Sequence, residues 1–258
     1  MNASITISLA QVPVVKGNVQ ANLSSHLAMI ERSSALGADV VVFPELSLIG
    51  YELELIGEQA FSHDPSNFTS LSQAAIEHNV VVIVGCPLKT PGAAKPAIGA
   101  VICFPNGAVK FYSKQYLHKG EEVYCSSGAE DYLFNIKGYR VALAICSDFS
   151  SPEHSLKARD LGADIYIVSA LISDSGIEPD AKLLSNIAEA NNFPVLLSNH
   201  ISPTGGWSAC GNNSVWDAGG HLVFGSDSKE SCVVLCSIEG REISVAKIEQ
   251  ISIGRVQP

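Results

Sequence analysis

Charged side chains are scarce in this chain of 258 residues. Asp, Glu, Lys and Arg make up 16% of it, against about 25% in typical soluble domains. Hydrophobic residues make up 47%, which excludes the intrinsically disordered class. The 16 basic residues are outnumbered by 26 acidic ones, so the formal net charge is −10. Proteins that bind nucleic acid or anionic membranes need a basic surface, and this composition predicts neither partner. The acidic balance favours neutral or cationic small molecules as substrates.

Signals for export and membrane insertion are also missing. Residues 1–15 lack the cationic start of a signal peptide. No apolar run approaches the roughly 18 residues of a transmembrane helix. The 7 cysteines are odd in number and none has C-x-x-C spacing, which favours reduced thiols over a disulfide scaffold. We therefore expect a cytoplasmic protein.

Motifs for metal ions and nucleotides are absent as well. The 7 histidines show no H-x-x-x-H or other ligand pairing. The chain contains neither a G-x-x-x-x-G-K-[ST] loop nor a G-x-G-x-x-G turn. We therefore expect no metal ion and no organic cofactor.

What is present is an alternation of apolar strands and amphipathic helices. Strands are expected at 5–12, 39–43, 80–85, 98–104, 108–112, 140–145, 164–170, 195–199, 213–217, 221–224 and 231–238. Helices are expected between Asn18 and Gly37 and at 71–78, 152–161 and 179–190. Such a pattern predicts an α/β fold with sheets covered by helices, and the hairpins make the sheets mixed. No linker divides the chain, so we expect a single domain over 1–258.

One short sequence occurs twice. LGAD stands at 36–39 and again at 161–164, each time between a predicted helix and a predicted strand. The repetition indicates either two similar halves or coincidence.

Three reactive side chains stand at the ends of predicted strands. Glu45 closes the run VVVFPE, Cys146 closes VALAIC, and Lys114 follows the second strand of a hairpin. The carboxyl ends of strands are where α/β sheets bind ligands. A thiol attacks an acyl carbon once a carboxylate has taken its proton. An ammonium, together with the backbone N–H of Ser147, can then stabilise the oxyanion.

Each of these residues alone has a structural explanation. A cysteine at a strand end is usually a packing residue, Glu45 could cap a helix, and Lys114 could be a solvated charge. They lie far apart in the sequence, so spacing alone does not bring them together.

A family resemblance links them. The stretches that carry it are ISLAQV at 7–12 with GN at 17–18 and NL at 22–23, FPEL at 43–46 with GY at 50–51, YSKQYL at 112–117, ICSDF at 145–149 with PE at 152–153, Asn199, and CGNNS at 210–214. In this order they resemble the nitrilase superfamily of carbon–nitrogen hydrolases over nearly the whole chain.

The resemblance implies a four-layer αββα sandwich and a Glu-Lys-Cys triad. Glu45 would be the general base, Lys114 the oxyanion stabiliser and Cys146 the nucleophile. The family also has a second glutamate about seven residues before a glycine. Glu121 stands seven residues before Gly128 and is our choice, with Glu122 as its rival.

Other site residues follow from the same motifs. Tyr51, which closes the glutamate motif, and Asn199, in the late strand pair, are the expected substrate-binding residues. His118 is either a surface residue or a substrate contact. His154 is expected to be structural. Trp207, after two glycines, belongs to a plain loop, a pocket rim or a subunit contact.

Some positions depart from the family pattern. Ser147 and Ser150 stand where an aromatic residue and an arginine are usual, and Ser113 and Tyr116 replace basic neighbours of the lysine. These changes keep the triad but alter the pocket wall.

The resulting hypothesis is a thiol-dependent hydrolase of a small amide or N-carbamoyl compound, with water as co-substrate and a Cys146 thioester as intermediate. Nitrile hydrolysis, acyl transfer on the same site, and a catalytically silent binding role are the alternatives. The apolar surplus and the family both favour a homodimer or larger homo-oligomer.

Overall fold

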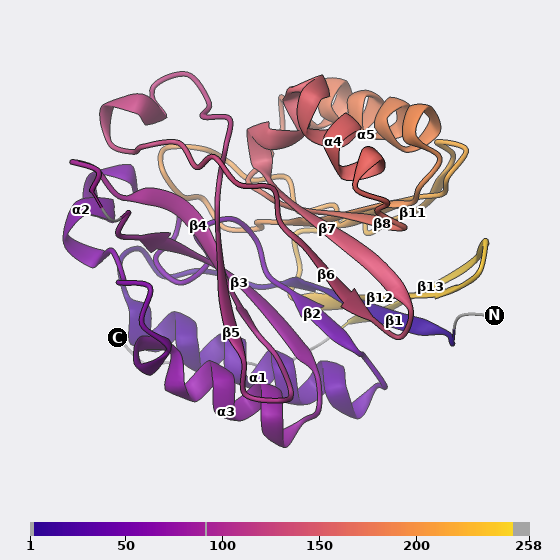
Figure 1. Ribbon diagram of the computed structural model, residues 1–258, viewed down its shortest axis with the longest axis horizontal. Coiled ribbons are helices and arrows are strands. Elements are labelled where there is room, and N and C mark those ends of the chain that lie inside the picture. The colour runs from indigo at the N-terminus through magenta and orange to yellow at the C-terminus, as the bar shows by residue number, and fades with distance from the viewer. Residues whose placement is uncertain (1–2, 91, 250–258) are drawn as a thin grey trace.

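Two β-sheets lie face to face between two pairs of helices in the computed structural model (Figure 1). The structure describes residues 3–90 and 92–249, so the two ends of the expected domain, 1–2 and 250–258, lie outside it. This arrangement confirms the predicted α/β fold with two mixed, helix-covered sheets. None of the helices in the described ranges has the length and apolar character needed to cross a bilayer.

The larger sheet has seven strands in the order β13-β12-β1-β2-β3-β4-β5. Their bounds are β1 Ile5–Gln11, β2 Val40–Val42, β3 Val81–Leu88, β4 Ala97–Cys103, β5 Val109–Ser113, β12 Cys232–Glu239 and β13 Glu242–Glu249. The other sheet has six strands in the order β11-β10-β9-β8-β7-β6. Their bounds are β6 Leu133–Ile136, β7 Tyr139–Ile145, β8 Ile165–Ala170, β9 Val195–Asn199, β10 Ser214–Trp216 and β11 Leu222–Gly225.

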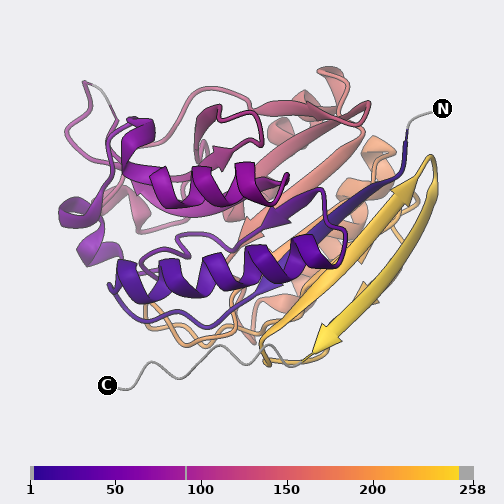
Figure 2. The ribbon, with the colours of Figure 1, turned by 90° about the horizontal axis from the view of Figure 1, so that it is seen from below.

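The helices are α1 Val19–Ala35, α2 Ile56–Gln59, α3 Thr69–Glu77, α4 Pro152–Asp160 and α5 Ile177–Asn191. Helices α1, α3, α4 and α5 form the outer layers, and the short α2 lies at one end of the molecule (Figure 1). Helices α1 and α3 run side by side under the larger sheet (Figure 2), whereas α4 and α5 cover the smaller one. The side chain of Asn18 caps α1 by accepting a hydrogen bond from the Ala21 N–H, as the sequence predicts.

Two strands were missing from the sequence expectations. β6 is only four residues long, and a hydrophobic pattern that short is hard to distinguish from a loop. β13 is an edge strand that begins and ends with glutamate, and charge is typical of edges that must not pair further. Each of the two strands is stabilised by antiparallel pairing with the long strand beside it.

The repeated LGAD sequence reflects two similar halves. Asp39 N–H donates to the Thr6 carbonyl at 2.7 Å, and its carboxylate accepts from Thr6 N–H at 2.8 Å. Asp164 makes the same pair of contacts with Arg140, at 2.7 and 2.8 Å. Strands β1 to β5 and β7 to β11 also follow one order, with three parallel strands and then two antiparallel ones.

Hydrogen bonds between the sheets join the two halves at one end. The Ser198 hydroxyl lies 3.1 Å from the carbonyls of both Ala10 and Val42. The Ser169 hydroxyl donates to the Phe43 carbonyl at 2.7 Å. Because these groups are buried, each bond also satisfies a polar atom that would otherwise be costly. The carboxyl ends of the parallel strands are thereby held against one another.

Gly85 on β3 makes room for the turn that follows β2. A β-carbon there would lie 2.3 Å from the Pro44 carbonyl oxygen and 2.4 Å from the Leu46 nitrogen. We expect Gly85→Ala to lower the free energy of unfolding by about 1–3 kcal/mol, the usual cost of overpacking. Urea unfolding measures this change. Gly57→Ala is the control, because its β-carbon meets nothing within 4 Å; equal midpoints for the two variants would contradict the prediction.

Candidate active site

Glu45, Lys114 and Cys146 meet where the strands of the two sheets end. Lys114 directly follows β5, Cys146 directly follows β7, and Glu45 lies in the turn after β2. The ammonium nitrogen of Lys114 is 2.8 Å from Oε1 of Glu45, and both side chains are fully buried. Cys146 is half-buried and shares a cavity with Glu45. The fold thus brings together three residues that sequence spacing could not connect.

A second carboxylate completes the buried cluster. Oε1 of Glu121 also lies 2.8 Å from Nζ of Lys114. The same carboxylate accepts hydrogen bonds from the Tyr51 hydroxyl and from the His118 backbone N–H. Glu122 is exposed and does not reach the lysine. Of the two rival glutamates, the structure therefore places Glu121 beside Lys114.

One buried ammonium lies between two carboxylates, and burial together with these charges sets the protonation states. Burial raises the pKa of Glu45 to about 7, with Glu121 adding to the rise and Lys114 opposing it. Burial disfavours the charge on Lys114, but Glu45, Cys146 and Glu121 outweigh it and raise the pKa of the ammonium. Burial and Glu45 raise the pKa of the Cys146 thiol well above its usual range. At rest the lysine is charged and the thiol keeps its proton.

The two oxygens of Glu45 have different surroundings. Oε1 is held by Lys114. Oε2 is buried and accepts no hydrogen bond from the described residues. An acceptor without a partner beside a protonated thiol is arranged for proton transfer.

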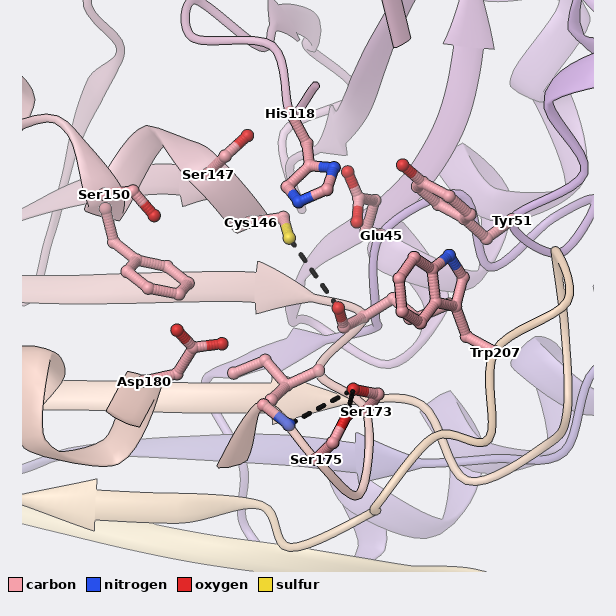
Figure 3. A pocket seen from close by; sticks show the side chains of 14 residues that line it. Glu45, Tyr51, His118, Cys146, Ser147, Ser150, Ser173, Ser175, Asp180 and Trp207 are labelled. Atoms are coloured by element: carbon pink, nitrogen blue, oxygen red, sulfur yellow. Dashed lines mark hydrogen bonds between the residues drawn. The ribbon is translucent and has the colours of Figure 1, made fainter. Parts of the chain in front are cut away.

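Cys146 sits in a strained turn that exposes its sulfur. Its φ angle is +45°, in the left-handed region that non-glycine residues seldom adopt. It ends β7 and begins a short 3-10 helix, Cys146–Ser150. Sγ lies 3.8 Å from the Leu171 carbonyl oxygen and faces the cavity (Figure 3). Backbone strain of this kind is concentrated at functional sites.

The cavity above the cluster has a volume of about 380 Å³. Glu45, Tyr51 and Cys146 line it, and Trp207 closes one side (Figure 3). His118 also lines the cavity, and its side chain is exposed. It is therefore a surface residue that stands where a substrate could contact it. Ser150, expected from the sequence to alter the pocket wall, also lines the cavity. Lining residues without an expected role include Phe149, Ile172 and Asp180.

Comparison with known proteins shows the family of this chain. The model of the carbon–nitrogen hydrolase family matches residues 6–247. The chain belongs to the carbon–nitrogen hydrolase family. A 2-oxoglutaramate amidase of Bacillus subtilis is 29% identical over 167 residues, which cover 64% of each chain. An (R)-stereoselective amidase of Pseudomonas is 27% identical over 223 residues, covering 84% of this chain and 79% of that one.

Some relatives extend beyond the match. The matched stretch spans less than two thirds of the 2-oxoglutaramate amidase and 29% of a glutamine-dependent NAD(+) synthetase of Xylella fastidiosa. Among solved structures, a carbon–nitrogen hydrolase superfamily protein of Xanthomonas campestris has a TM-score of 0.84 and 21% identity, covering 92% of this chain and 91% of that one. A nitrilase superfamily protein of Saccharomyces cerevisiae has a TM-score of 0.81 and 21% identity, covering 95% and 90%. These structures share the fold.

Hydrogen bonds from neighbouring segments hold the turn that carries Glu45 in this carbon–nitrogen hydrolase. Nε2 of His200 contacts the Glu45 carbonyl oxygen. Burial lowers the pKa of His200 to about 4, so the ring is neutral and donates from Nε2. Leu48 N–H bonds to the Gly85 carbonyl at 3.0 Å. Sequence patterns did not single out His200, because a buried histidine leaves no periodic signal.

Asp148 ties the lysine segment to the cysteine turn. Its Oδ1 accepts from the backbone N–H groups of Gln115 and Tyr116, both at 2.9 Å. Its Oδ2 accepts from Ile145 N–H at 2.9 Å and from the Tyr112 hydroxyl at 2.7 Å. The side chain is fully buried. Asp148 belongs to the quoted ICSDF motif, yet only the three-dimensional contacts reveal what it does.

His154 extends this support away from the cavity, which agrees with its expected structural role. Its Nε2 lies 2.9 Å from the Tyr112 hydroxyl, and its Nδ1 lies 2.7 Å from the Tyr166 hydroxyl.

Asn199 lies behind the cavity wall and not among the lining residues. Its Oδ1 accepts from Ile172 N–H at 2.7 Å, and its Nδ2 donates to the carbonyls of Ile172 and Gly211 at 3.2 and 2.7 Å. The amide therefore holds the segment after β8 in place and has no group turned to the cavity. Ser147 does line the cavity, and its hydroxyl donates to the Tyr116 carbonyl at 2.6 Å. Its backbone N–H as an oxyanion donor stays a prediction.

Replacing Asp148 by asparagine tests this support. An amide NH₂ would face two of the four donors that the carboxylate now accepts, and buried unsatisfied donors cost about 1–3 kcal/mol. We expect Asp148→Asn to lower the free energy of unfolding by that amount, measured by urea titration. Asp131→Asn is the control, because Asp131 is exposed and accepts an exposed hydrogen bond from the side-chain amide of Gln115 instead of bonds from buried donors. Equal losses in both variants would contradict the role given to Asp148.

Proposed function

We propose that this protein hydrolyses a small non-peptide amide through a thioester on Cys146. The observation that carries the proposal is that Glu45 and Cys146 share one cavity while Lys114 is bonded to Glu45 at 2.8 Å. The family match and the amidases among its relatives support amide chemistry. N-carbamoyl compounds belong to the same substrate class, because they present the same carbonyl bonded to nitrogen.

The first step is attack by the thiol. Oε2 of Glu45 takes the Cys146 proton as Sγ bonds to the amide carbon, and the carbonyl electron pair moves onto oxygen. An ammonium has three donors, and two of those on Lys114 serve Glu45 and Glu121. The third remains for the oxyanion, with the Ser147 N–H as second donor. Charge-matched donors in a site with little water are worth several kcal/mol in such steps.

The second half-reaction releases the acid. When the oxyanion collapses, the C–N bond breaks and Glu45 returns its proton to the leaving nitrogen, so ammonia or an amine departs. Water then gives a proton to Glu45 and attacks the thioester. Sγ leaves and recovers the proton, and the carboxylic acid is free. Glu121, which also accepts a hydrogen bond from Tyr51, keeps Lys114 in position during both half-reactions.

Substituting the nucleophile tests this mechanism. Cys146→Ala should abolish ammonia or amine release from a panel of small amides, ω-amides, N-carbamoyl compounds and nitriles, because no other group in the cluster can form the acyl-enzyme. Cys236→Ala, at a buried packing position on β12, should keep wild-type turnover. The panel also separates amide from nitrile hydrolysis.

Turnover by Cys146→Ala at the wild-type rate would contradict the thioester mechanism. If hydroxylamine as acceptor yields hydroxamate faster than water yields acid, acyl transfer takes the place of hydrolysis. If the protein hydrolyses no compound of the panel and Cys146 is alkylated no faster than the other thiols, the results favour a binding role without catalysis.

The pH profile tests the role of Glu45. Glu45 must be ionised to accept the thiol proton, and its pKa lies near 7. kcat/KM should therefore fall about tenfold for each pH unit below 7 and level off above it, because this parameter reports the free enzyme. A flat profile between pH 5 and 8 would contradict Glu45 as the base.

Two expectations about the whole protein stay predictions. A homodimer has indirect support from exposed apolar side chains on the smaller-sheet side of the molecule, which include Leu156, Leu161 and Leu222. A cytoplasmic location still rests on the sequence.

A further inference from the structure

Asp180 places a second carboxylate in the wall of the cavity. It lies in the first turn of α5, near the amino end of that helix. Its side chain is half-buried and lines the same cavity as Cys146. Figure 3 shows it on the side of the cavity opposite Trp207. Nothing in the proposed hydrolysis uses this group.

Asp180 also lacks a partner. In the described ranges, no ion pair and no side-chain hydrogen bond involves its carboxylate. Asp174, six positions earlier, is paired with Lys229 at 2.7 Å and with the Ser208 hydroxyl at 2.6 Å. Burial raises the pKa of Asp180, with His118 opposing the rise. A partly desolvated carboxylate that faces a cavity gains from a cation placed there.

The rest of the cavity offers little to an anion. Among the described residues that line it, none is an arginine or a lysine. Lys114 lies below it, already shared between Glu45 and Glu121. His118 is the one basic side chain on the wall within the described ranges. A substrate with a second, anionic end would therefore meet Glu45 and Asp180 with no matching cation.

Apolar side chains also line the cavity. They include Phe149, in the short 3-10 helix that begins at Cys146, and the exposed indole of Trp207. A short hydrocarbon stem fits such walls. An aromatic ring at the rim also attracts an ammonium through its π face.

We propose that Asp180 makes this enzyme select amides whose far end carries a positive charge, such as ω-amino amides. This inference rests on the proposed hydrolase function and names its substrate class. The amide binds at Cys146, the stem lies along Phe149, and the ammonium pairs with Asp180. The ammonium takes no part in bond making or breaking, so the reaction steps are unchanged.

Three amides with one spacer test the selection. 4-Aminobutanamide, pentanamide and the monoamide of glutaric acid place an ammonium, a methyl group or a carboxylate at the end of the same chain. We expect kcat/KM to fall in that order for the wild type. Aminoamides with one to four methylene groups, assayed alongside, find the spacer that best matches the distance to Asp180.

Asp180→Asn isolates the charge. It should lower kcat/KM for the best aminoamide about tenfold, the size of one screened charge pair at short range, mostly through KM. It should leave pentanamide unchanged. Asp160→Asn removes the same charge from the exposed surface of α4 and should change none of the three. Far-ultraviolet circular dichroism checks that each variant is folded.

A thiol assay gives a second readout that does not need turnover. Cys146 attacks the sulfur of a methanethiosulfonate, forming a mixed disulfide and releasing methanesulfinate, while its proton leaves to the base. The cationic 2-aminoethyl reagent should label Cys146 faster than the anionic 2-sulfonatoethyl reagent, as followed by peptide mass spectrometry. Asp180→Asn should reduce this ratio about tenfold relative to Asp160→Asn.

The outcomes separate the two proposals. If amides are hydrolysed but Asp180→Asn keeps the wild-type selectivity in both assays, the inference is overturned and the hydrolase stands. If no amide is hydrolysed yet the labelling ratio depends on Asp180, the cation-selective cavity is supported and the hydrolase is overturned. Loss of both preferences in Asp180→Asn, with pentanamide turnover retained, supports both.

Discussion

The ion cluster of Lys114 with Glu45 and Glu121 is the constraint on which the rest of the structure depends. Taking three charges out of water costs several kcal/mol for each ion, and only short, well-aligned contacts offset it. Here both contacts are 2.8 Å. Burial of Glu45 raises its pKa to about 7, with the second carboxylate of Glu121 adding to the rise and Lys114 opposing it. A base adjusted in this way can take a proton from a thiol and later return it.

Such a cluster keeps its geometry only where the surrounding structure is rigid, and the two packed sheets provide that rigidity. Both halves end their parallel strands at the same edge, where Ser169 and Ser198 bond across the sheets. Asp148 then joins the segment after β5 to the turn after β7. The left-handed backbone at Cys146 is tolerated because these bonds leave the turn no alternative. The site therefore consists of residues that position the reacting groups as well as of the reacting groups themselves.

Sequence reasoning reached the triad through ordered motifs, and it reached the layers through hydrophobic periodicity. It also preferred Glu121 to Glu122, and the structure places Glu121 beside Lys114. What it could not supply is the contacts that decide such choices. Glu121 and Glu122 are adjacent and chemically alike, and burial beside Lys114 distinguishes them. Asn199 has the chemistry of a substrate ligand, but its amide is fully engaged in holding Ile172. Sequence patterns did not single out Asp180, because its place in the cavity depends on how α5 packs.

By itself, the sequence determined most of the elements, their order and the reactive groups at the strand ends. These are local properties: the spacing of apolar side chains sets helix or strand, and residue type sets the available chemistry. The tertiary structure alone decided which carboxylate faces Lys114, which donors hold Asp148 and which charges line the cavity. Those outcomes depend on distances of a few ångströms between segments remote in the chain. Electrostatic energy in a buried site varies steeply with such distances, and no local pattern records them.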